Sequence, residues 1–451
     1  MITYFNPFTR RAFAVALAGL FCTQSACNAD IIPPDVQPAK SEPASSPALA
    51  TASAFQAAAA AKDPVPDEPE RTASWPGEQA QFEQALTDLG LSLLRDLPAD
   101  RNAVVSAFSL ANALGLVQMG AMGKTGRELS ALFQPVSSGT HLLALRMGEI
   151  NAVLAQPQTG VSLTSANRLW VSQNLAKTLE PAYVKSTQQH FQSDAHLQNF
   201  EQPQAAADSI NAWVNATTKG KITQLLQAAQ IKPDTHLVLT NAVHFKGQWE
   251  TPFDRADTSK APFTLSNGQT VSVPTMRRVL HGGWAEQNGV QWLELPYAGE
   301  NVSMHIVLPA PGQSLTALQA RLSGAQWSAW ADRLRMTQVD VSMPRFKLGG
   351  DVMAIKPSLQ KLGVETVFTQ AADLSAISQS HGLMLDDVYQ AATVQVDEEG
   401  AEAAAATAVV SVSKGLRMPR RVEINRPFLF AIVHKPTQTQ LFVGRVMNPL
   451  P

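Results

Sequence analysis

The chain has little cysteine and no surplus of charge of either sign. Only two cysteines, Cys22 and Cys27, occur in 451 residues, which excludes a disulfide scaffold and any cysteine-based zinc site in the rest of the chain. The 35 basic residues are balanced by 37 acidic ones, so no basic excess is available to neutralise phosphates, and we expect no nucleic-acid partner. A hydrophobic content of 45% excludes a disordered acidic chain and favours a large buried core.

Enzyme motifs are also missing. The sequence GAMGKT at 120–125 resembles a phosphate loop, but Gln118 stands where that loop needs its first glycine, so we expect a turn between helices. The nine histidines show no metal-binding spacing, and no G-x-S-x-G nucleophile elbow occurs. The carboxylate pairs at 386–387 and 398–399 have no pocket-forming context, and we expect them to be solvated. We therefore expect a protein that is not an enzyme and needs no metal or cofactor.

Residues 1–29 have the pattern of an export signal. Two arginines at 10–11 precede an apolar stretch at 12–21, and small residues follow at 25–29. The apolar stretch is about half of the ~20 residues that a membrane-spanning helix needs, and no other stretch is long and apolar enough. We expect an exported protein, located outside the cell, in a periplasm, or at the outer membrane or cell surface as a lipoprotein.

Two cleavage sites fit this signal. Cleavage before Cys27 would leave that cysteine at the new N-terminus for lipid attachment, as in bacterial lipoproteins. Gln24, however, stands where an aliphatic residue is usual. Ordinary cleavage near Ala26 or Ala29 is the alternative, and an uncleaved buried helix is a third.

Residues 30–76 differ in composition from the rest of the chain. They contain nine prolines and a run of five alanines at 57–61, with few large apolar side chains to offset the entropy of ordering. We interpret them as a semi-extended tether, which suits a domain held off a membrane or wall. The alternative is an ordinary disordered N-terminus.

Residues 77–451 are predicted to form one domain, because no linker or repeat interrupts them. Helices precede most of the strands, which indicates an α+β arrangement. Helices are expected at 82–97, 110–117, 208–216 and 222–230, strands at 236–240, 303–308, 339–343, 429–433 and 441–446, and a hairpin turn at 435–439.

Motifs in this domain resemble the serpin family, in the family's order along the chain. They are NAVHFKGQW at 241–249, LPY at 295–297, SMHIVLP at 303–309, MPRFK at 343–347, ADLS at 372–375, DEEGAEAAAATAVV at 397–410, NRPFLF at 425–430 and LFVGRVMNP at 441–449. The resemblance implies the serpin fold, with three β-sheets, eight to nine helices and an exposed reactive-centre loop. It also implies that 397–410 contains the hinge of that loop.

The hinge also has a physical interpretation. Gly400 can adopt backbone angles closed to other residues, so the chain can turn there. Beyond it, alternate residues fall on opposite faces of an extended strand, and one face is small and nearly apolar. The hinge residues are Glu399, Gly400, Ala401, Glu402, Ala403, Ala404, Ala405 and Ala406, and only Glu402 places a charge beyond Gly400, on the other face. Such a segment can enter a sheet as a new strand; an alanine-rich helix or linker is the alternative.

By resemblance, the protein is a suicide-substrate inhibitor that forms a covalent complex with a serine protease. The protease acylates at the loop, and the hinge inserts into the main sheet before the ester is hydrolysed. Alanine at position 401 supports inhibition, since non-inhibitory relatives tend to carry charged or bulky residues there. A non-inhibitory serpin that acts as a carrier, chaperone or surface interaction protein is the alternative.

The scissile bond is predicted between Lys414 and Gly415. In the family's common spacing, the scissile residue lies 14 positions beyond the hinge glycine. A lysine there fits a trypsin-like protease, whose specificity pocket ends in a carboxylate. Arg417 is the rival position.

The resemblance also assigns a cluster at which the main sheet opens. Ser106, Ser109 and Asn241 match its members, and Gln390 replaces the family's usual histidine, so we expect no histidine-type pH switch there. Trp249 matches the aromatic residue where the hinge enters the sheet. After Arg127, where some relatives bind glycosaminoglycans, only two basic residues follow at 141 and 146, so no such activator is expected. We expect a monomer.

Overall fold

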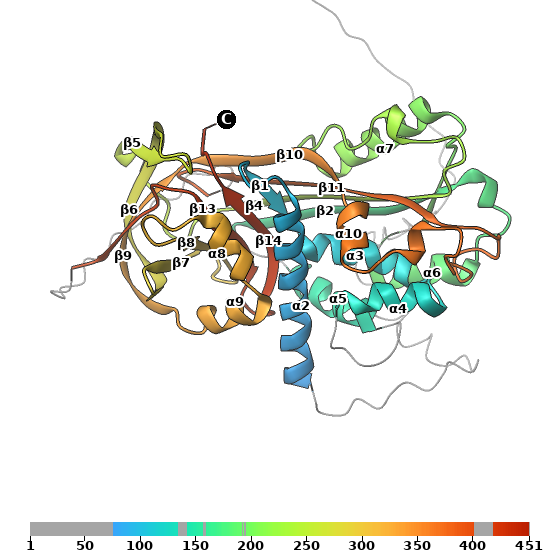
Figure 1. Cartoon of the computed structure of the whole chain (residues 1–451), viewed down its shortest axis with the longest axis horizontal. Coiled ribbons are helices and arrows are strands. Elements are labelled where there is room, and N and C mark those ends of the chain that lie inside the picture. The colour runs from blue at the N-terminus through green and yellow to red at the C-terminus, as the bar shows by residue number, and fades with distance from the viewer. Residues whose placement is uncertain are drawn as a thin grey trace, which may run out of the picture. The chain divides into compact units, whose positions relative to one another are not determined.

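The computed structural model describes residues 75–133, 142–156, 159–191, 193, 195–400 and 418–450, and these belong to one compact unit (Figure 1). The predicted signal and tether, Cys27, the hinge residues 401–406, Lys414, Gly415 and Arg417 lie outside the described residues. Within them, no helix combines the length and the apolarity that crossing a bilayer requires.

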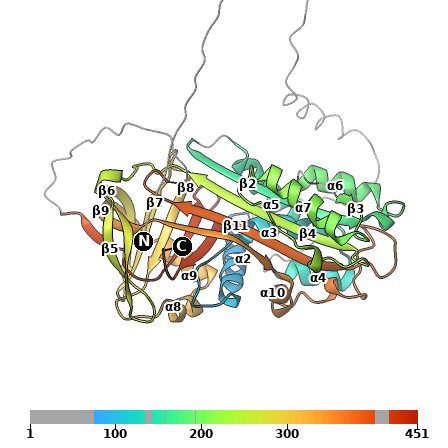
Figure 2. The same ribbon diagram turned by 90° about the horizontal axis from the view of Figure 1, so that it is seen from above.

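A five-stranded sheet forms the long axis of the fold. Its strands follow the order β10 (Phe346–Ala354), β11 (Leu385–Val396), β4 (Leu237–Gly247), β2 (Val161–Ser172) and β3 (Ala195–Gln198). β11 and β4 run parallel to each other, whereas β10–β11 and β2–β4 are antiparallel. Figure 2 shows β11, β4 and β2 side by side along this axis.

A nine-stranded network forms the other end. It runs through β1 (Ala103–Val105), β14 (Thr439–Val446), β13 (Phe428–His434), β8 (Val302–Leu308), β7 (Val290–Pro296), β6 (Thr270–Gln287), β9 (Arg335–Pro344) and β12 (Arg420–Glu423), with β5 (Ser259–Thr264) paired to β6. The long β6 pairs with β9 from Thr275 to Trp284 and with β7 from Gly283 to Gln287. Three sheets were expected; because β6 pairs with both β7 and β9, the strands outside the five-stranded sheet form one connected network.

Nine α-helices pack around the strands in the described part of the chain, within the expected number. They are α2 (Trp75–Asp96), α3 (Ala107–Gln118), α4 (Gly123–Ala131), α5 (Leu142–Leu154), α6 (Pro181–Phe191), α7 (Pro203–Thr217), α8 (Leu315–Arg321), α9 (Gly324–Ala331) and α10 (Lys356–Lys361). Figure 1 shows α3 to α6 on one side of the five-stranded sheet and α7 on the other.

The alternation of β2 explains these two layers. Leu169 and Val171 point into the main core, whereas Ala166 and Trp170 point into a second cluster beneath α7. The two central strands, β4 and β11, are covered on both faces, and most of their residues are buried. α3 is buried along its whole length, which fits its lack of a polar face.

Most predicted elements agree with the structure, and one does not. The expected helix at 82–97 is α2, and the hairpin turn at 435–439 joins β13 to β14. The turn expected at 120–125 is shorter: residues 119–122 join α3 to α4, which begins at Gly123. The helix expected at 222–230 is wrong: only the short 3-10 turn Ala228–Gln230 is helical there.

Candidate functional site

The seam between β4 and β11 is the central feature of the five-stranded sheet. These strands are parallel neighbours from the pair Leu237–Leu385 to the pair Phe245–Val394. Both strands therefore end at the same edge, β4 at Gly247 and β11 at Val396. A chain that turns back at this edge would run antiparallel to both strands, and could pair with both if they separated.

The chain does turn back there, at 397–400. The Asp397 amide donates to the Gly400 carbonyl at 2.9 Å, and the Gly400 amide donates to the Asp397 carbonyl at 3.2 Å. Gly400 also forms a β-bridge with Gln248, just past the end of β4. The last residue of the turn thus already lies at the entrance of the seam.

Only glycine fits at position 400. Its φ is +117°, a conformation that side-chain-bearing residues rarely adopt. A Cβ atom there would lie 2.0 Å from the Gly247 carbonyl oxygen and 2.7 Å from the Gln248 Cα. Both atoms belong to the backbone of β4 and its extension, so neither can move aside easily.

Trp249 fastens the turn to the end of β4. Its backbone amide donates to the Glu399 carbonyl at 3.0 Å, and its indole Nε1 donates to the Asp397 carbonyl at 2.9 Å. The indole stacks on Tyr297, with ring centroids 4.5 Å apart and planes 6° apart. Trp249 therefore lies against the turn at 397–400.

The carboxylate pair 398–399 corrects the expectation of solvated charges. Glu398 is only 2% exposed and accepts a hydrogen bond from Thr258 Oγ1 at 2.7 Å, with Arg345 Nη1 at 3.4 Å. Burial opposes ionisation of Glu398, but the Thr258 hydrogen bond and the Arg345 charge outweigh it and hold its pKa below the usual value. Glu399 pairs with the exposed Arg255 at 2.7 Å. Both carboxylates therefore help to hold the turn.

The pair 386–387 is not fully solvated either. Asp386, at the start of β11, is half-buried and accepts the backbone amides of His236 at 2.8 Å and Leu237 at 3.1 Å. Burial raises its pKa above the usual value, although these amide bonds oppose the shift. Asp386 thus fastens the opposite end of the seam.

Ser106, Asn241 and Gln390 meet beneath the middle of the seam. The Ser106 hydroxyl donates to the Leu441 carbonyl at 2.6 Å and accepts the Ser109 amide at 3.1 Å, which caps α3. Gln390 Nε2 donates to the Ser106 carbonyl at 3.0 Å and to Asn241 Oδ1 at 2.5 Å. Since Asn241 and Gln390 are register partners on β4 and β11, this hydrogen bond crosses the seam.

Asn241 extends the cluster to β2. Its Nδ2 donates to Ser109 Oγ at 2.5 Å and to Asn167 Oδ1, and Ser109 Oγ also bonds Ser165 Oγ at 2.9 Å. The cluster therefore ties α3 to three neighbouring strands. Gln390 contributes a neutral side chain that donates to Ser106 and Asn241 and accepts the Ser106 amide at 3.2 Å.

Several of these residues were not singled out from the sequence. Asn167 lies directly opposite Asn241 in the β2–β4 register, and Tyr297 lies under Trp249. Glu398 precedes the predicted hinge in the sequence, but its side chain was expected to be solvated. Their roles depend on strand register and on contacts between distant segments, and only the motif containing Tyr297 carried a signal in the sequence.

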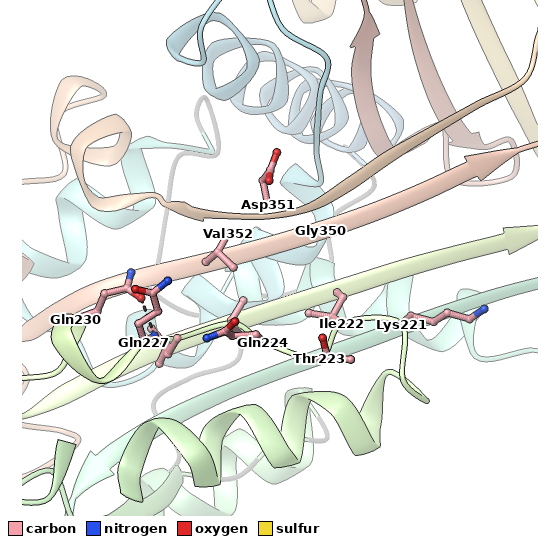
Figure 3. A pocket seen from close by; sticks show the side chains of 11 residues that line it. Lys221, Ile222, Thr223, Gln224, Gln227, Gln230, Gly350, Asp351 and Val352 are labelled. Atoms are coloured by element: carbon pink, nitrogen blue, oxygen red, sulfur yellow. Dashed lines mark hydrogen bonds between the residues drawn. The ribbon is translucent and has the colours of Figure 1, made fainter. Parts of the chain in front are cut away.

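A hollow of about 650 Å³ lies over the same sheet, between the segment 221–230 and the β10 residues 350–352 (Figure 3). Figure 3 shows Gln224, Gln227 and Gln230 along one side and Asp351 on the other. Among the described residues, no group of three or more His, Cys, Asp or Glu side chains is placed to hold a metal ion.

Comparisons with known proteins agree with this geometry. A family model described as Serpin (serine protease inhibitor) matches residues 84–449. Human serpin I2 is 31% identical over 375 residues, which cover 81% of this chain and 91% of the relative. Mouse leukocyte elastase inhibitor A is 33% identical over 382 residues, 82% of this chain and 100% of the relative.

The fold is likewise shared with solved structures. Native protease nexin-1, crystallised with heparin, superposes with a TM-score of 0.73 at 28% identity, covering 82% of this chain and 99% of that chain. The family model matches nearly all of the described residues, and two relatives above 30% identity are matched over most of their length. This chain therefore belongs to the serpin family.

Proposed function

We propose that the protein is a suicide-substrate inhibitor of serine proteases that turns over no substrate of its own. The observation that carries this proposal is the position of Gly400, which bridges Gln248 at the entrance of the seam while β4 and β11 are still paired. The next residues along the chain can continue this bridge as a new strand. Family membership and the similarity to a leukocyte elastase inhibitor support the same function.

The proposed reaction begins as ordinary proteolysis. The protease serine oxygen attacks the carbonyl carbon of the scissile residue, the peptide bond breaks, and the new amine leaves with a proton. An ester then joins the N-terminal fragment of the loop to the protease. If the hinge enters the seam before water reaches that ester, the protease is carried along and its catalytic geometry is distorted.

The residues after Gly400 suit this insertion. A strand that continued the Gly400–Gln248 bridge would have one face against the core, on the side of Phe245, and the other on the side of the partly exposed Lys246. Ala401, Ala403 and Ala405 share one face, so no bulky or charged side chain has to be buried there. The hydrogen bonds from Gln390 to Asn241 and to Ser106 would break or rearrange as the strands part.

Cleavage of the loop tests insertion directly. A sixth strand would gain backbone hydrogen bonds on both sides, so we expect loop-nicked protein to unfold roughly 10 °C or more above intact protein. The comparison uses differential scanning calorimetry of the same preparation before and after nicking. An unchanged or lower midpoint would contradict the insertion mechanism.

We further propose a trypsin-like target and a scissile bond between Lys414 and Gly415. Lys414→Glu should abolish trypsin inhibition, whereas Arg417→Glu should have a lesser effect. The C-terminal fragment should begin at Gly415. Undiminished inhibition by Lys414→Glu, or a fragment beginning at Met418, would contradict this assignment without affecting the insertion mechanism.

Ala401→Arg should convert the inhibitor into a substrate, because insertion would bury an unpaired guanidinium. Glu402→Arg is the matched control, since position 402 lies on the other face and already carries a charge. The yield of covalent complex with trypsin should fall in the first variant and be largely kept in the second. Equal yields from Ala401→Arg and the parent would refute the assigned hinge orientation.

Export and lipid anchoring complete the proposal. The signal at 1–29 and the tether at 30–76 suit a monomeric inhibitor displayed outside the cell, with Cys27 as the lipidated residue. A cell that makes the protein should incorporate labelled fatty acid into the parent chain and not into Cys27→Ser. Equal incorporation would exclude Cys27, and absence of label from both would favour ordinary cleavage.

A further inference from the structure

A small hollow lies within the nine-stranded network, and none of its lining residues comes from β4 or β11. It has a volume of about 280 Å³ and lies where the β6–β7 hairpin meets the C-terminal end of α9 and the start of β9. Trp284, Trp292, Trp330 and Val290 give it aromatic and apolar walls. No step of the proposed inhibitory mechanism uses these residues.

The aromatic walls are held in place by packing. Trp292 is buried, and its ring centroid lies 4.5 Å from that of Trp327 and 5.3 Å from that of Trp330. Trp284 lies opposite Leu293 in the β6–β7 pairing and opposite Arg335 in the β6–β9 pairing. Four of the eight tryptophans of the chain gather here, so a ring that enters the hollow meets preformed aromatic surface.

The rim of the hollow is basic. Arg333 Nη1 donates to Gln287 Oε1 at 2.5 Å, and Arg335 Nη1 donates to the backbone carbonyls of Asp332 and Leu334, both at 2.9 Å. A guanidinium has five N–H donors, so each arginine keeps several for another acceptor. Neither is ion-paired with a carboxylate in the described part of the chain.

A third arginine adds to this charge. The Arg420 guanidinium carbon lies 4.9 Å from the centroid of the Trp284 ring, a cation–π contact, and no described carboxylate pairs with it. One carboxylate, Glu286, lines the hollow, and its side chain is exposed at the hairpin. Two guanidinium groups and one carboxylate line the hollow, and Arg420 stacks on one of its walls, which leaves positive charge beside an aromatic cavity.

We infer that this hollow binds a small aromatic carboxylate. The tryptophans would bury the ring, and Arg333 and Arg335 would take the carboxylate through charge-assisted hydrogen bonds, for which a guanidinium offers paired donors. The volume lies just below the usual range of pockets for drug-sized ligands, so the ligand has one or two rings. This inference does not depend on the inhibitory function.

Isothermal titration calorimetry of the intact protein tests it with two probes of the same shape. 1-Naphthaleneacetate carries the carboxylate, and 1-naphthaleneacetamide replaces it with a neutral amide. We expect saturable one-to-one binding of the acid, and binding of the amide about tenfold weaker or more, because the amide lacks the charge that the arginines recognise. Equal binding of both probes, or no saturable binding of the acid below about 1 mM, overturns the inference.

Two arginine variants localise the site. Arg335→Gln keeps polar atoms at the rim but removes one charge, and should weaken the acid about tenfold without weakening the amide. Arg321→Gln removes an exposed charge from the last turn of α8, outside the hollow, and should leave both affinities unchanged. Both variants should keep the parental thermal midpoint, since neither side chain is buried. Equal weakening of the acid in the two variants would mean that net charge, and not this hollow, binds it.

Discussion

Replacing Gly400 by alanine tests whether the docked turn prepares the hinge for insertion. The native φ of +117° alone would cost an alanine ~1–3 kcal/mol. Its Cβ would also lie 2.0 Å from the Gly247 carbonyl oxygen, too close for either backbone to accommodate. We expect the turn to leave the edge of β4 and to lose the two hydrogen bonds that Trp249 donates to the carbonyls of Glu399 and Asp397, about 1 kcal/mol each.

The strain of the docked turn in Gly400→Ala, ~1–3 kcal/mol before the clash is counted, is enough to offset the ~2 kcal/mol of those two hydrogen bonds. Because acyl-enzyme hydrolysis competes with insertion, a hinge that starts undocked should insert more slowly, and more inhibitor should be consumed as substrate. The assay titrates a fixed amount of trypsin and measures how many inhibitor molecules are used for each protease inactivated. We expect a value close to one for the parent, and a rise of about tenfold or more for the variant.

Gly312→Ala is the matched control. Gly312 has a φ of +79° in the turn between β8 and α8, but no atom lies within 4 Å of the place that a Cβ would take, and the site is remote in the chain from the seam. It should lower the thermal midpoint through backbone strain while leaving the number of inhibitor molecules per protease unchanged. If Gly400→Ala inhibits with the parental stoichiometry, the docked turn does not prepare insertion.

Three further predictions concern the core and the cluster beneath the seam. Burial raises the pKa of Glu83 to about 8, although a hydrogen bond from Thr439 opposes the shift, so the stabilisation by Glu83 is complete below pH 4.5 and is lost as the pH rises through 8. Glu83→Gln should remove this decline in the free energy of unfolding, which is on the order of 5 kcal/mol. Parallel pH profiles of urea unfolding for parent and variant would refute this. Ser106→Ala removes the cap of α3 and the hydrogen bond to the Leu441 carbonyl, and should lower the free energy of unfolding in urea titrations by about 1–2 kcal/mol. An unchanged free energy of unfolding would contradict the assigned cap. In Gln390→His, the difference in thermal midpoint from the parent should change with pH between about 5.5 and 7.5, because a histidine titrates near 6.5. A difference that stays constant over this range would show that a charge at position 390 does not affect stability.

The strands of the C-terminal hairpin are predictable because burial dominates their sequence. Every residue of β13 and β14 is buried, so both appear as continuous apolar-rich runs on either side of a polar turn. The first two residues of the predicted hinge, Glu399 and Gly400, follow β11, most of whose residues are buried; the assignment of the rest of the hinge stays a prediction.

The segment 222–230 shows where local pattern fails. Ile222, Leu225 and Leu226 have helical spacing, yet the chain there is mostly irregular. Asn211 of α7 accepts the amides of Leu225 and Leu226 at 2.7 and 2.9 Å and donates to the Leu226 carbonyl at 2.8 Å. A side chain thus replaces the hydrogen bonds that a helix would provide, and the three apolar side chains pack beneath α7 instead.

The burial of Glu398 could not be predicted from its neighbourhood in the sequence. Its partners Thr258 and Arg345 are 140 and 53 residues away, and they meet it only because the turn docks at the end of β4. Asn167 is hidden in the same way, since its place opposite Asn241 depends on the register of two antiparallel strands.

The covalent complex with trypsin is the most direct test of the central claim. The protein is incubated with active trypsin, denatured in SDS, and examined by gel electrophoresis and intact-mass spectrometry. The account predicts an SDS-stable species whose mass is that of trypsin plus the inhibitor chain ending at Lys414, together with a released peptide 415–451. A chain that is only nicked, beside trypsin of undiminished activity and with no such species, would contradict it.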